Sequence, residues 1–100
     1  MESFTVRLRR RALADVGAIR RWYRGIDPSL EDRFVIELNE TLDRMRQIPL
    51  AYQVIYRNTR RISLRKFPYN VYYLVQDPKV VVLAVLHQKR DPALAMRAFE

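Results

Sequence analysis

The longest apolar run in the sequence, VVVLAVL at residues 80 to 86, places the strongest constraint on the fold. It is far shorter than the roughly 18 residues of a membrane-spanning helix, so it belongs in a protein core. Successive side chains of a strand point to opposite faces, and a continuous apolar run therefore buries both faces. The segment KVVVLAVLH (79 to 87) predicts a central strand of a sheet rather than an edge strand.

Other segments have the two-residue apolar period of strands with one buried face. In RRISLRKF (60 to 67), Ile62 and Leu64 share one face and the other face is basic. Asp77 and Pro78 predict a tight turn into the central strand. The predicted strands are 3 to 9, 60 to 67, 70 to 76 and 79 to 87, with QVIYRN (53 to 58) as either a short strand or an irregular lead-in.

Residues 12 to 48 have the apolar period of helices. The first apolar stripe consists of Ala12, Val16, Ile19, Tyr23 and Ile26. Gly25 predicts the end of this helix, because glycine commonly terminates helices. Asp27 can cap a second helix that begins at Pro28 and ends near Ile48, before Pro49. The short connection predicts an antiparallel helical hairpin.

These elements predict one α+β domain that spans residues 1 to 100. An N-terminal strand and a two-helix hairpin are followed by an antiparallel meander of three or four strands. Asp91 and Pro92 repeat the pair that starts the second helix, so ALAMRAFE (93 to 100) predicts a short C-terminal helix. Layered packing places the hairpin on one face of the sheet and leaves the opposite face free to bind a partner.

The net charge of +8 favours polyanionic partners such as DNA, RNA, the ribosome or an acidic protein. Residues 1 to 50 carry ten arginines against eight acids, and residues 51 to 100 carry nine Lys and Arg against three acids. The positive field is therefore assigned mainly to the second half. The absence of cysteine excludes disulfides and thiolate chemistry. We expect a cytoplasmic protein with no membrane association, no metal and no cofactor.

Two segments carry a resemblance to a known family: RRISLRKFPYNVYYLV (60 to 75), with FPY followed by YY, and VVVLAVLHQKRDP (80 to 92). Together with the order of a strand, two helices and a meander, they resemble the RelE/ParE superfamily of toxins from bacterial type II toxin-antitoxin systems. The resemblance covers nearly the whole chain. It implies a small RelE/ParE-like fold and a cognate antitoxin whose C-terminal segment wraps the toxin in a toxin-antitoxin hetero-oligomer.

The superfamily contains toxins with two kinds of target, and the fold does not distinguish them. ParE-like members poison DNA gyrase, whereas RelE-like members are ribosome-dependent mRNA endoribonucleases. FPY and VLHQKRDP are more similar to the ParE-like branch, which we favour. Nucleolytic relatives commonly pair the histidine with an adjacent or C-terminal tyrosine, but here Gln88 follows His87 and the tail contains no tyrosine. A third hypothesis is a basic nucleic-acid-binding domain without toxin activity.

The alternative, metal-independent RNA cleavage, needs a base for the 2′-hydroxyl proton and cations around the phosphorane. Arg61 and Arg65 are predicted on the polar face of one strand, about 13 Å apart along it, and His87 at the end of another. If these ends meet, a histidine that titrates near neutrality lies among guanidinium groups. The other interpretation of His87 is a structural residue whose ring packs on an aromatic side chain. The catalytic candidates are Arg61, Arg65, His87 and Arg90.

The segment RNTRRISLRK (57 to 66) contains five positive charges and no acid. Such a patch could bind phosphate or receive an acidic antitoxin segment. Trp22 and Tyr23 are adjacent on one helix and cannot both point inward, so one is expected at a contact surface. The residues expected to bind the target or the antitoxin are Arg57, Arg60, Arg61, Arg65, Lys89, Arg90, Trp22 and Phe99.

Overall fold

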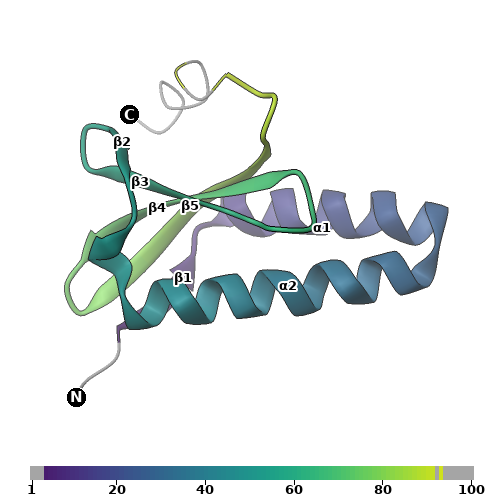
Figure 1. Ribbon diagram of the computed structural model, residues 1–100, viewed down its shortest axis with the longest axis horizontal. Helices are drawn as coiled ribbons and strands as arrows, with labels where there is room; N and C mark the ends of the chain where they lie inside the picture. The colour runs from purple at the N-terminus through teal and green to yellow at the C-terminus, as the bar shows by residue number, and fades with distance from the viewer. Residues whose placement is uncertain (1–3, 92, 94–100) are drawn as a thin grey trace.

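The computed structural model describes residues 4 to 91 and residue 93. Within these residues, a helical hairpin is followed by the strands of a meander, as Figure 1 shows. Along the chain the elements are β1 (Thr5–Leu8), α1 (Arg10–Ile26), α2 (Pro28–Gln47), the short 3₁₀ helix η1 (Pro49–Ala51), β2 (Val54–Tyr56), β3 (Thr59–Ser63), β4 (Tyr69–Gln76) and β5 (Lys79–His87). This order confirms the predicted α+β class.

The sheet has the strand order β1-β5-β4-β3-β2. β1 runs parallel to β5, whereas β2 to β5 form an antiparallel meander. The apolar run thus lies in a strand with a neighbour on each side, and residues 80 to 86 are all buried. The central position predicted for residues 79 to 87 is confirmed.

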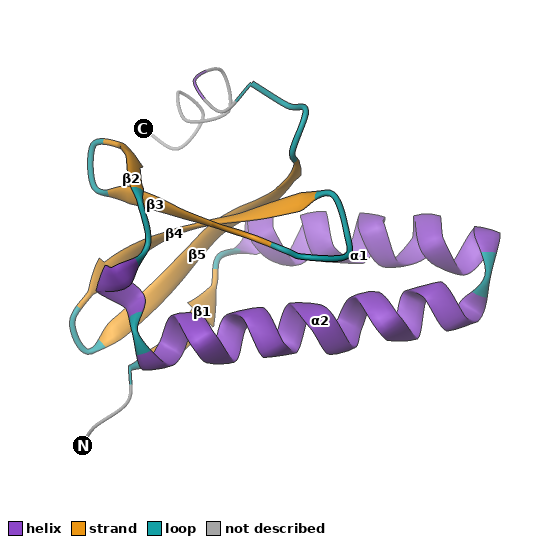
Figure 2. Cartoon of the chain, viewed as in Figure 1, coloured by secondary structure: helices purple, strands orange, loops and turns teal. Residues whose placement is uncertain are grey.

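Both helices pack on the same face of the sheet, and the main core lies between the two layers (Figure 2). The apolar stripes of the helices face the sheet because this arrangement removes both apolar surfaces from water. The buried residues of this core include Ala12, Ile19, Phe34, Leu38, Met45, Ile62, Val71, Tyr73, Val80, Val82 and Val85.

Asp27 ends one helix and begins the next. Its backbone N–H donates to the carbonyl of Tyr23 at 2.8 Å, and its carboxylate accepts the backbone N–H of Ser29 at 2.9 Å. The bond from the Ser29 N–H lowers the pKa of the Asp27 carboxyl. The predicted cap is confirmed, but the predicted helix end at Gly25 is wrong. Gly25 keeps a negative φ, so α1 continues through it to Ile26.

A β-bulge in β5 determines which of its side chains face away from the helices. Tyr72 on β4 pairs with Ala84, but Tyr73 pairs with Val82, so Leu83 has no partner on β4. The extra residue shifts the alternation along the strand, and the face opposite the helices acquires an apolar cluster of its own. The buried members of this second cluster are Tyr72, Ala84 and Leu86.

The chain beyond β5 is described only to residue 91 and at residue 93. The Asp91 carboxylate accepts the backbone N–H of Ala93 at 2.9 Å, as expected for an aspartate that caps a helix. The rest of the predicted C-terminal helix, including Phe99, lies outside the described residues. Among the described residues, no helix has both the length and the apolar character that crossing a membrane requires.

Candidate functional site

The face of the sheet opposite α1 and α2, which we call the open face because neither helix covers it, carries a polar row beside its buried apolar cluster. The Ser63 hydroxyl donates to the Asn70 side-chain carbonyl at 2.7 Å, and the Asn70 amide donates to the Tyr72 hydroxyl at 3.3 Å. Asn70 is buried, so these bonds satisfy polar groups that would otherwise be costly to bury. Ile55 and Tyr56 pack against the apolar part of the same face. These contacts hold the side chains of the open face in place.

Arg61 lies on the open face, where it pairs with Tyr72 across the sheet. Its guanidinium donates to the side-chain carbonyl of Gln53 at 3.4 Å. Arg44, Arg61 and Arg65 line a pocket of about 350 Å³ that contains no carboxylate in its lining, and we call it the arginine pocket. Three guanidinium groups at one hollow can bind carboxylate or phosphate oxygens through paired N–H donors. Two of the predicted site residues are thus brought together.

Arg65 does not share a strand with Arg61, so the predicted placement of both on one strand face is wrong. β3 ends at Ser63, and Arg65 lies in the loop that leads to β4. The carboxylate of Glu37, on α2, accepts the backbone N–H groups of Arg65 and Lys66, the latter at 2.9 Å. Because Glu37 is buried, this contact fixes the loop to the helix. Arg65 reaches the arginine pocket from that loop.

Arg60 and Arg57 have different surroundings from Arg61. Arg60 donates to the backbone carbonyls of Leu50 at 3.1 Å and Tyr52 at 2.7 Å, so its guanidinium holds the segment around η1. Arg57 lies in the turn between β2 and β3 with a φ of 51°, and its guanidinium stands 5.5 Å from the centre of the Tyr56 ring. The guanidinium of Arg60 is therefore used in hydrogen bonds within the fold, whereas Arg57 lies at the edge of the sheet.

His87 ends β5 on the face that carries the helices, opposite Tyr69. Its ring meets the Tyr69 ring edge to face, with 5.4 Å between the ring centres. Its Nδ1 accepts the backbone N–H of Lys89 at 3.1 Å. Tyr69 belongs to the core on the helix side, whereas Arg61 pairs with Tyr72 on the open face. His87 and Arg61 therefore lie on opposite faces of the sheet and are not brought together.

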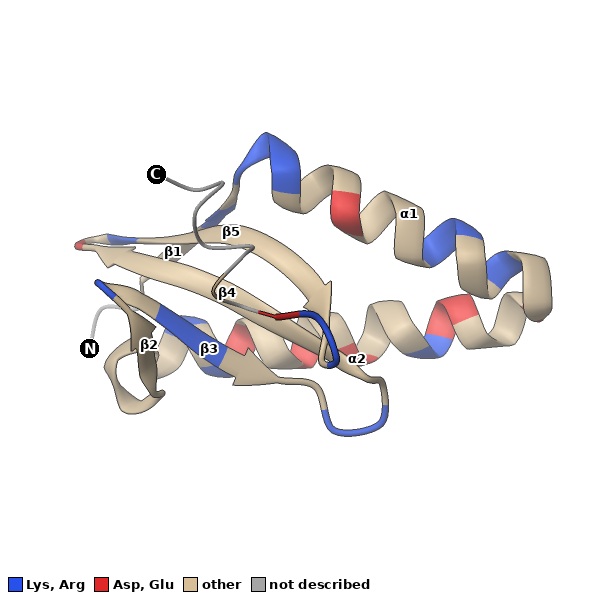
Figure 3. Ribbon diagram, turned by 90° about the horizontal axis from the view of Figure 1, so that it is seen from above, with Lys and Arg blue, Asp and Glu red and all other residues tan. Residues whose placement is uncertain are grey.

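Lys89 and Arg90 form an exposed basic corner after β5. The Gln88 N–H donates to the Pro68 carbonyl at 2.8 Å, and the Arg90 N–H donates to the His87 carbonyl at 2.9 Å. These bonds attach the corner to the end of the central strand. Figure 3 shows this corner and other basic residues around the margin of the sheet, with most acidic residues on the helices. Within the described residues, no cluster of three or more His, Asp or Glu side chains could hold a metal ion.

Trp22 is the exposed member of the aromatic pair on α1, with 65% of its surface accessible. Tyr23 instead packs into the core, where its ring centre lies 5.1 Å from that of Phe67. Burial raises the pKa of the Tyr23 hydroxyl, and the neighbouring Tyr69 raises it further. The expectation that only one of the two points inward is confirmed.

A family model for the ParE toxin of the type II toxin-antitoxin system parDE matches residues 6 to 92. The chain belongs to this family of ParE toxins. It is accordingly the toxin component of a type II toxin-antitoxin module, for which a cognate antitoxin is the expected partner. The predicted superfamily and the preference for its ParE-like branch are confirmed.

The ParE toxin fold is also found in a solved structure described as the chromosomal ParDE TA system from P. aeruginosa. The two chains are 18% identical and superpose with a TM-score of 0.74, over 84% of this chain and 95% of the other. At this level of identity the likeness concerns the fold. A search of curated proteins gave no match.

Two features of this ParE toxin were missed from the sequence. Glu37 could have been found, because it is a carboxylate between Phe34 and Leu38 on the apolar face of α2. The second feature is the charge of α1, which carries five arginines and one acid, whereas α2 carries five acids and three arginines. Both helices lie in the first half of the sequence. The net charge of that half therefore does not reveal that α1 is basic and α2 is acidic.

Proposed function

We propose that this ParE toxin inhibits DNA gyrase by binding to it, without nucleolytic chemistry, and that a cognate antitoxin neutralises it. The observation that carries the proposal is the placement of His87. A general base and the cations that stabilise a phosphorane must reach the same phosphate. His87 faces the helix side and its Nδ1 accepts a backbone N–H, whereas Arg61 faces the opposite side. This arrangement favours a binding protein over a ribonuclease.

We further propose that the basic corner, Lys89 and Arg90, contacts the target. Both side chains are exposed, and backbone hydrogen bonds tie their segment to the end of a buried central strand. Because the backbone of this segment is already held, binding has to order only the two side chains, which limits the entropic cost. Trp22 offers an exposed aromatic surface of the kind enriched in protein interfaces.

The arginine pocket is the proposed receptor for an acidic segment of the antitoxin. Arg44, Arg61 and Arg65 converge there, and guanidinium groups pair with carboxylates through two parallel hydrogen bonds. The pocket also lies next to β2, the edge strand of the sheet, so an antitoxin segment that enters it can continue along that strand past Val54 and Tyr56. An antitoxin bound in this way would cover the surface around the pocket and hinder approach of a large target.

The target assignment is tested by assaying the purified full-length toxin for gyrase inhibition and, separately, for cleavage of ribosome-bound mRNA. We expect stabilised gyrase-DNA cleavage complexes or lost supercoiling, and intact mRNA. His87→Ala should leave gyrase inhibition largely unchanged. Cleavage of mRNA that disappears in His87→Ala would instead establish the RelE-like alternative. Binding of free nucleic acid without either activity would favour the basic nucleic-acid-binding domain.

Charge reversal tests the two surfaces. Lys89→Glu or Arg90→Glu should weaken gyrase inhibition more than Arg33→Glu, a matched reversal at an exposed arginine on α2. Arg61→Glu or Arg65→Glu should weaken antitoxin binding by at least about tenfold, measured by calorimetry with the purified antitoxin. Lys66→Glu is the matched control, because Lys66 is in the same loop but does not line the arginine pocket. Equal losses in the control and the pocket variants would remove the pocket from the interface.

A further inference from the structure

A second cationic pocket lies at the start of α1, apart from the arginine pocket. Its volume is about 410 Å³, and its lining contains four cations and no acid. The cations come from three places in the sequence: Arg7 from β1, Arg9 and Arg10 from the junction with α1, and Lys79 from the start of β5. The parallel pairing of β1 with β5 brings them together, since Thr5 pairs with Lys79 and Arg7 pairs with Val81. We call this the junction pocket.

None of the four cations forms an ion pair with another described residue. Other arginines of the chain do have carboxylate partners, such as Arg20 and Arg24 with Glu31. Asp77 precedes Lys79 in the turn but does not line the pocket. Like charges gathered at one hollow repel one another. An anion in the junction pocket would remove that unfavourable energy.

The backbone adds to the positive potential of the same pocket. Arg9 is the N-cap of α1 but makes no side-chain capping bond, and the first turn of α1 contains no acidic residue. The first N–H groups of a helix have no partner within the helix and form the positive end of its dipole. α2 differs, because Asp27 caps it and Glu31 lies in its first turn. The start of α1 thus lacks the anionic groups that α2 has in its own sequence.

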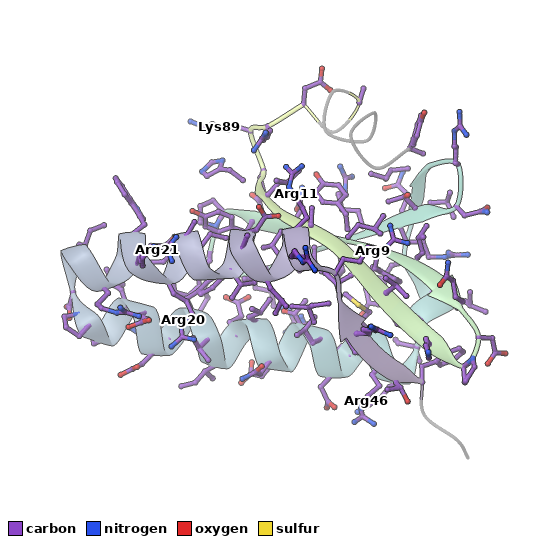
Figure 4. The ribbon with its side chains drawn as sticks, turned by 180° about the vertical axis from the view of Figure 1, so that it is seen from behind. Arg9, Arg11, Arg20, Arg21, Arg46 and Lys89 are labelled. Carbon is purple, nitrogen blue, oxygen red and sulfur yellow. The ribbon has the colours of Figure 1, made fainter. Side chains whose placement is uncertain are left out.

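We propose that the junction pocket binds a phosphate group, carried either by a nucleic-acid backbone or by a small phosphate-containing molecule. Arginine side chains present planar sets of N–H donors that match phosphate oxygens. An acidic protein segment fits less well, because Leu8 and Val81 are the only apolar side chains in the lining to anchor a peptide. Figure 4 shows Arg9 near the start of α1 and Arg21 farther along that helix, and Arg21 does not line the junction pocket.

This inference goes beyond gyrase inhibition and does not depend on it, since its test contains no gyrase. The full-length toxin is labelled with ¹⁵N, and its amide resonances are followed during addition of inorganic phosphate or of a short DNA duplex. We expect phosphate to shift the amides of Arg10, Arg11 and Ala12 before those of α2. The same shifts should be weakened in Arg9→Ala and Lys79→Ala, whose exposed positions leave the core intact.

Binding of the duplex is then measured by fluorescence anisotropy over a series of salt concentrations. Each lost phosphate contact should reduce the slope of log K against log salt by about 0.9, so Arg9→Ala and Lys79→Ala should each show a change of that size. Arg21→Ala is the matched control, because it removes one positive charge from an exposed position on α1 outside the junction pocket. Its change in slope should be clearly smaller.

The outcomes separate the sources of the phosphate. Amide shifts with both ligands, together with the reduced slopes, identify a nucleic-acid backbone; shifts with inorganic phosphate alone identify a small phosphate-containing molecule. The proposal is overturned if neither ligand shifts the first turn of α1, or if Arg21→Ala changes the slope as much as the pocket variants. A third titration uses a short peptide of aspartate and glutamate. The proposal is also overturned if this peptide alone shifts these amides, because the pocket then receives an acidic protein segment.

Discussion

The carboxylate of Asp15, on α1, accepts the backbone N–H of Val85, on β5, at 3.0 Å. β1 covers this edge of β5 only as far as Val82, where the Arg9 N–H donates to the Val82 carbonyl at 2.9 Å. Beyond that point a side chain of the helix supplies the acceptor that a longer β1 would have supplied. The contact therefore joins the helical layer to the central strand.

Asp15→Ala is expected to lower the free energy of unfolding by about 1 to 3 kcal/mol, because it leaves the Val85 N–H without its acceptor. Asp15→Asn keeps a side-chain oxygen and should cost less. Arg11→Ala is the control, since Arg11 forms a partly exposed ion pair with Asp15 at 3.6 Å, worth at most about 1 kcal/mol. Urea denaturation of the three variants measures the differences. A larger loss in Arg11→Ala than in Asp15→Ala would contradict this account.

Glu31 should make the stability of the toxin depend on pH in the acid range. Two hydrogen bonds from Arg24, and one from Arg20, lower the pKa of Glu31 from 4.5 to about 2. A carboxyl whose pKa is lower in the folded state stabilises that state above its unfolded pKa. This contribution is therefore present above about pH 4.5 and is lost as the pH falls toward 2.

The comparison of wild type with Glu31→Gln between pH 2 and pH 6 tests this linkage. We expect the variant to be less stable at pH 6 and its disadvantage to shrink as the pH falls, measured by thermal unfolding. Asp32→Asn, at the next residue, provides a matched change at an exposed carboxylate. An equal pH dependence in wild type and Glu31→Gln would mean that the ion pairs with Arg20 and Arg24 add nothing to stability.

Glu37→Ala is expected to release the loop between β3 and β4. The carboxylate accepts the N–H groups of Arg65 and Lys66, and removal of a buried acceptor costs about 1 to 3 kcal/mol. Hydrogen exchange should accelerate at these two amides more than in the strands. Glu40→Ala, an exposed position on the same helix, should leave their exchange unchanged. Slow exchange in Glu37→Ala would show that something else holds the loop.

Ionisation of the Tyr73 hydroxyl should lower the stability of the toxin at alkaline pH. Its hydroxyl donates to the Pro49 carbonyl at 2.6 Å, and burial raises its pKa from 10.0 to about 12. A group whose pKa is raised in the folded state stabilises it fully below the unfolded pKa, and this contribution is lost as the pH rises from 10 toward 12. Tyr73→Phe should therefore lose less stability than wild type over that interval, as urea denaturation at each pH would reveal. Equal losses of stability in Tyr73→Phe and wild type would exclude Tyr73 as the source of this pH dependence.

The strands and helices could be read from the sequence because each depends on a local pattern. The alternation around Ile62 and the unbroken run from Val80 to Leu86 are set by which side chains avoid water, and both predictions are confirmed. The pairing of β1 with β5 could not be read, because no local pattern in four residues specifies a neighbour more than 70 residues away. Its parallel direction makes the sheet mixed, whereas the meander from β2 to β5 is antiparallel as predicted.

The candidate site was harder to predict than the fold. The relation of His87 to Arg61 depends on strand register, and a one-residue difference moves a side chain to the other face. The position of Arg65 depends on Glu37, a residue of another element. Arg60 looked like part of a basic surface, but its hydrogen bonds to Leu50 and Tyr52 are formed only after the chain folds back on itself.

The parallel pairing of β1 with β5 also determines when the sheet can be completed during synthesis. Thr5 is synthesised well before its partner on the central strand, Lys79. Until that strand leaves the ribosome, β1 and β4 each lack the neighbour that lies between them in the sheet. Pairing over such a long stretch of chain is slow to form. A chain that ends before β5 would therefore lack the finished sheet, and with it the open face.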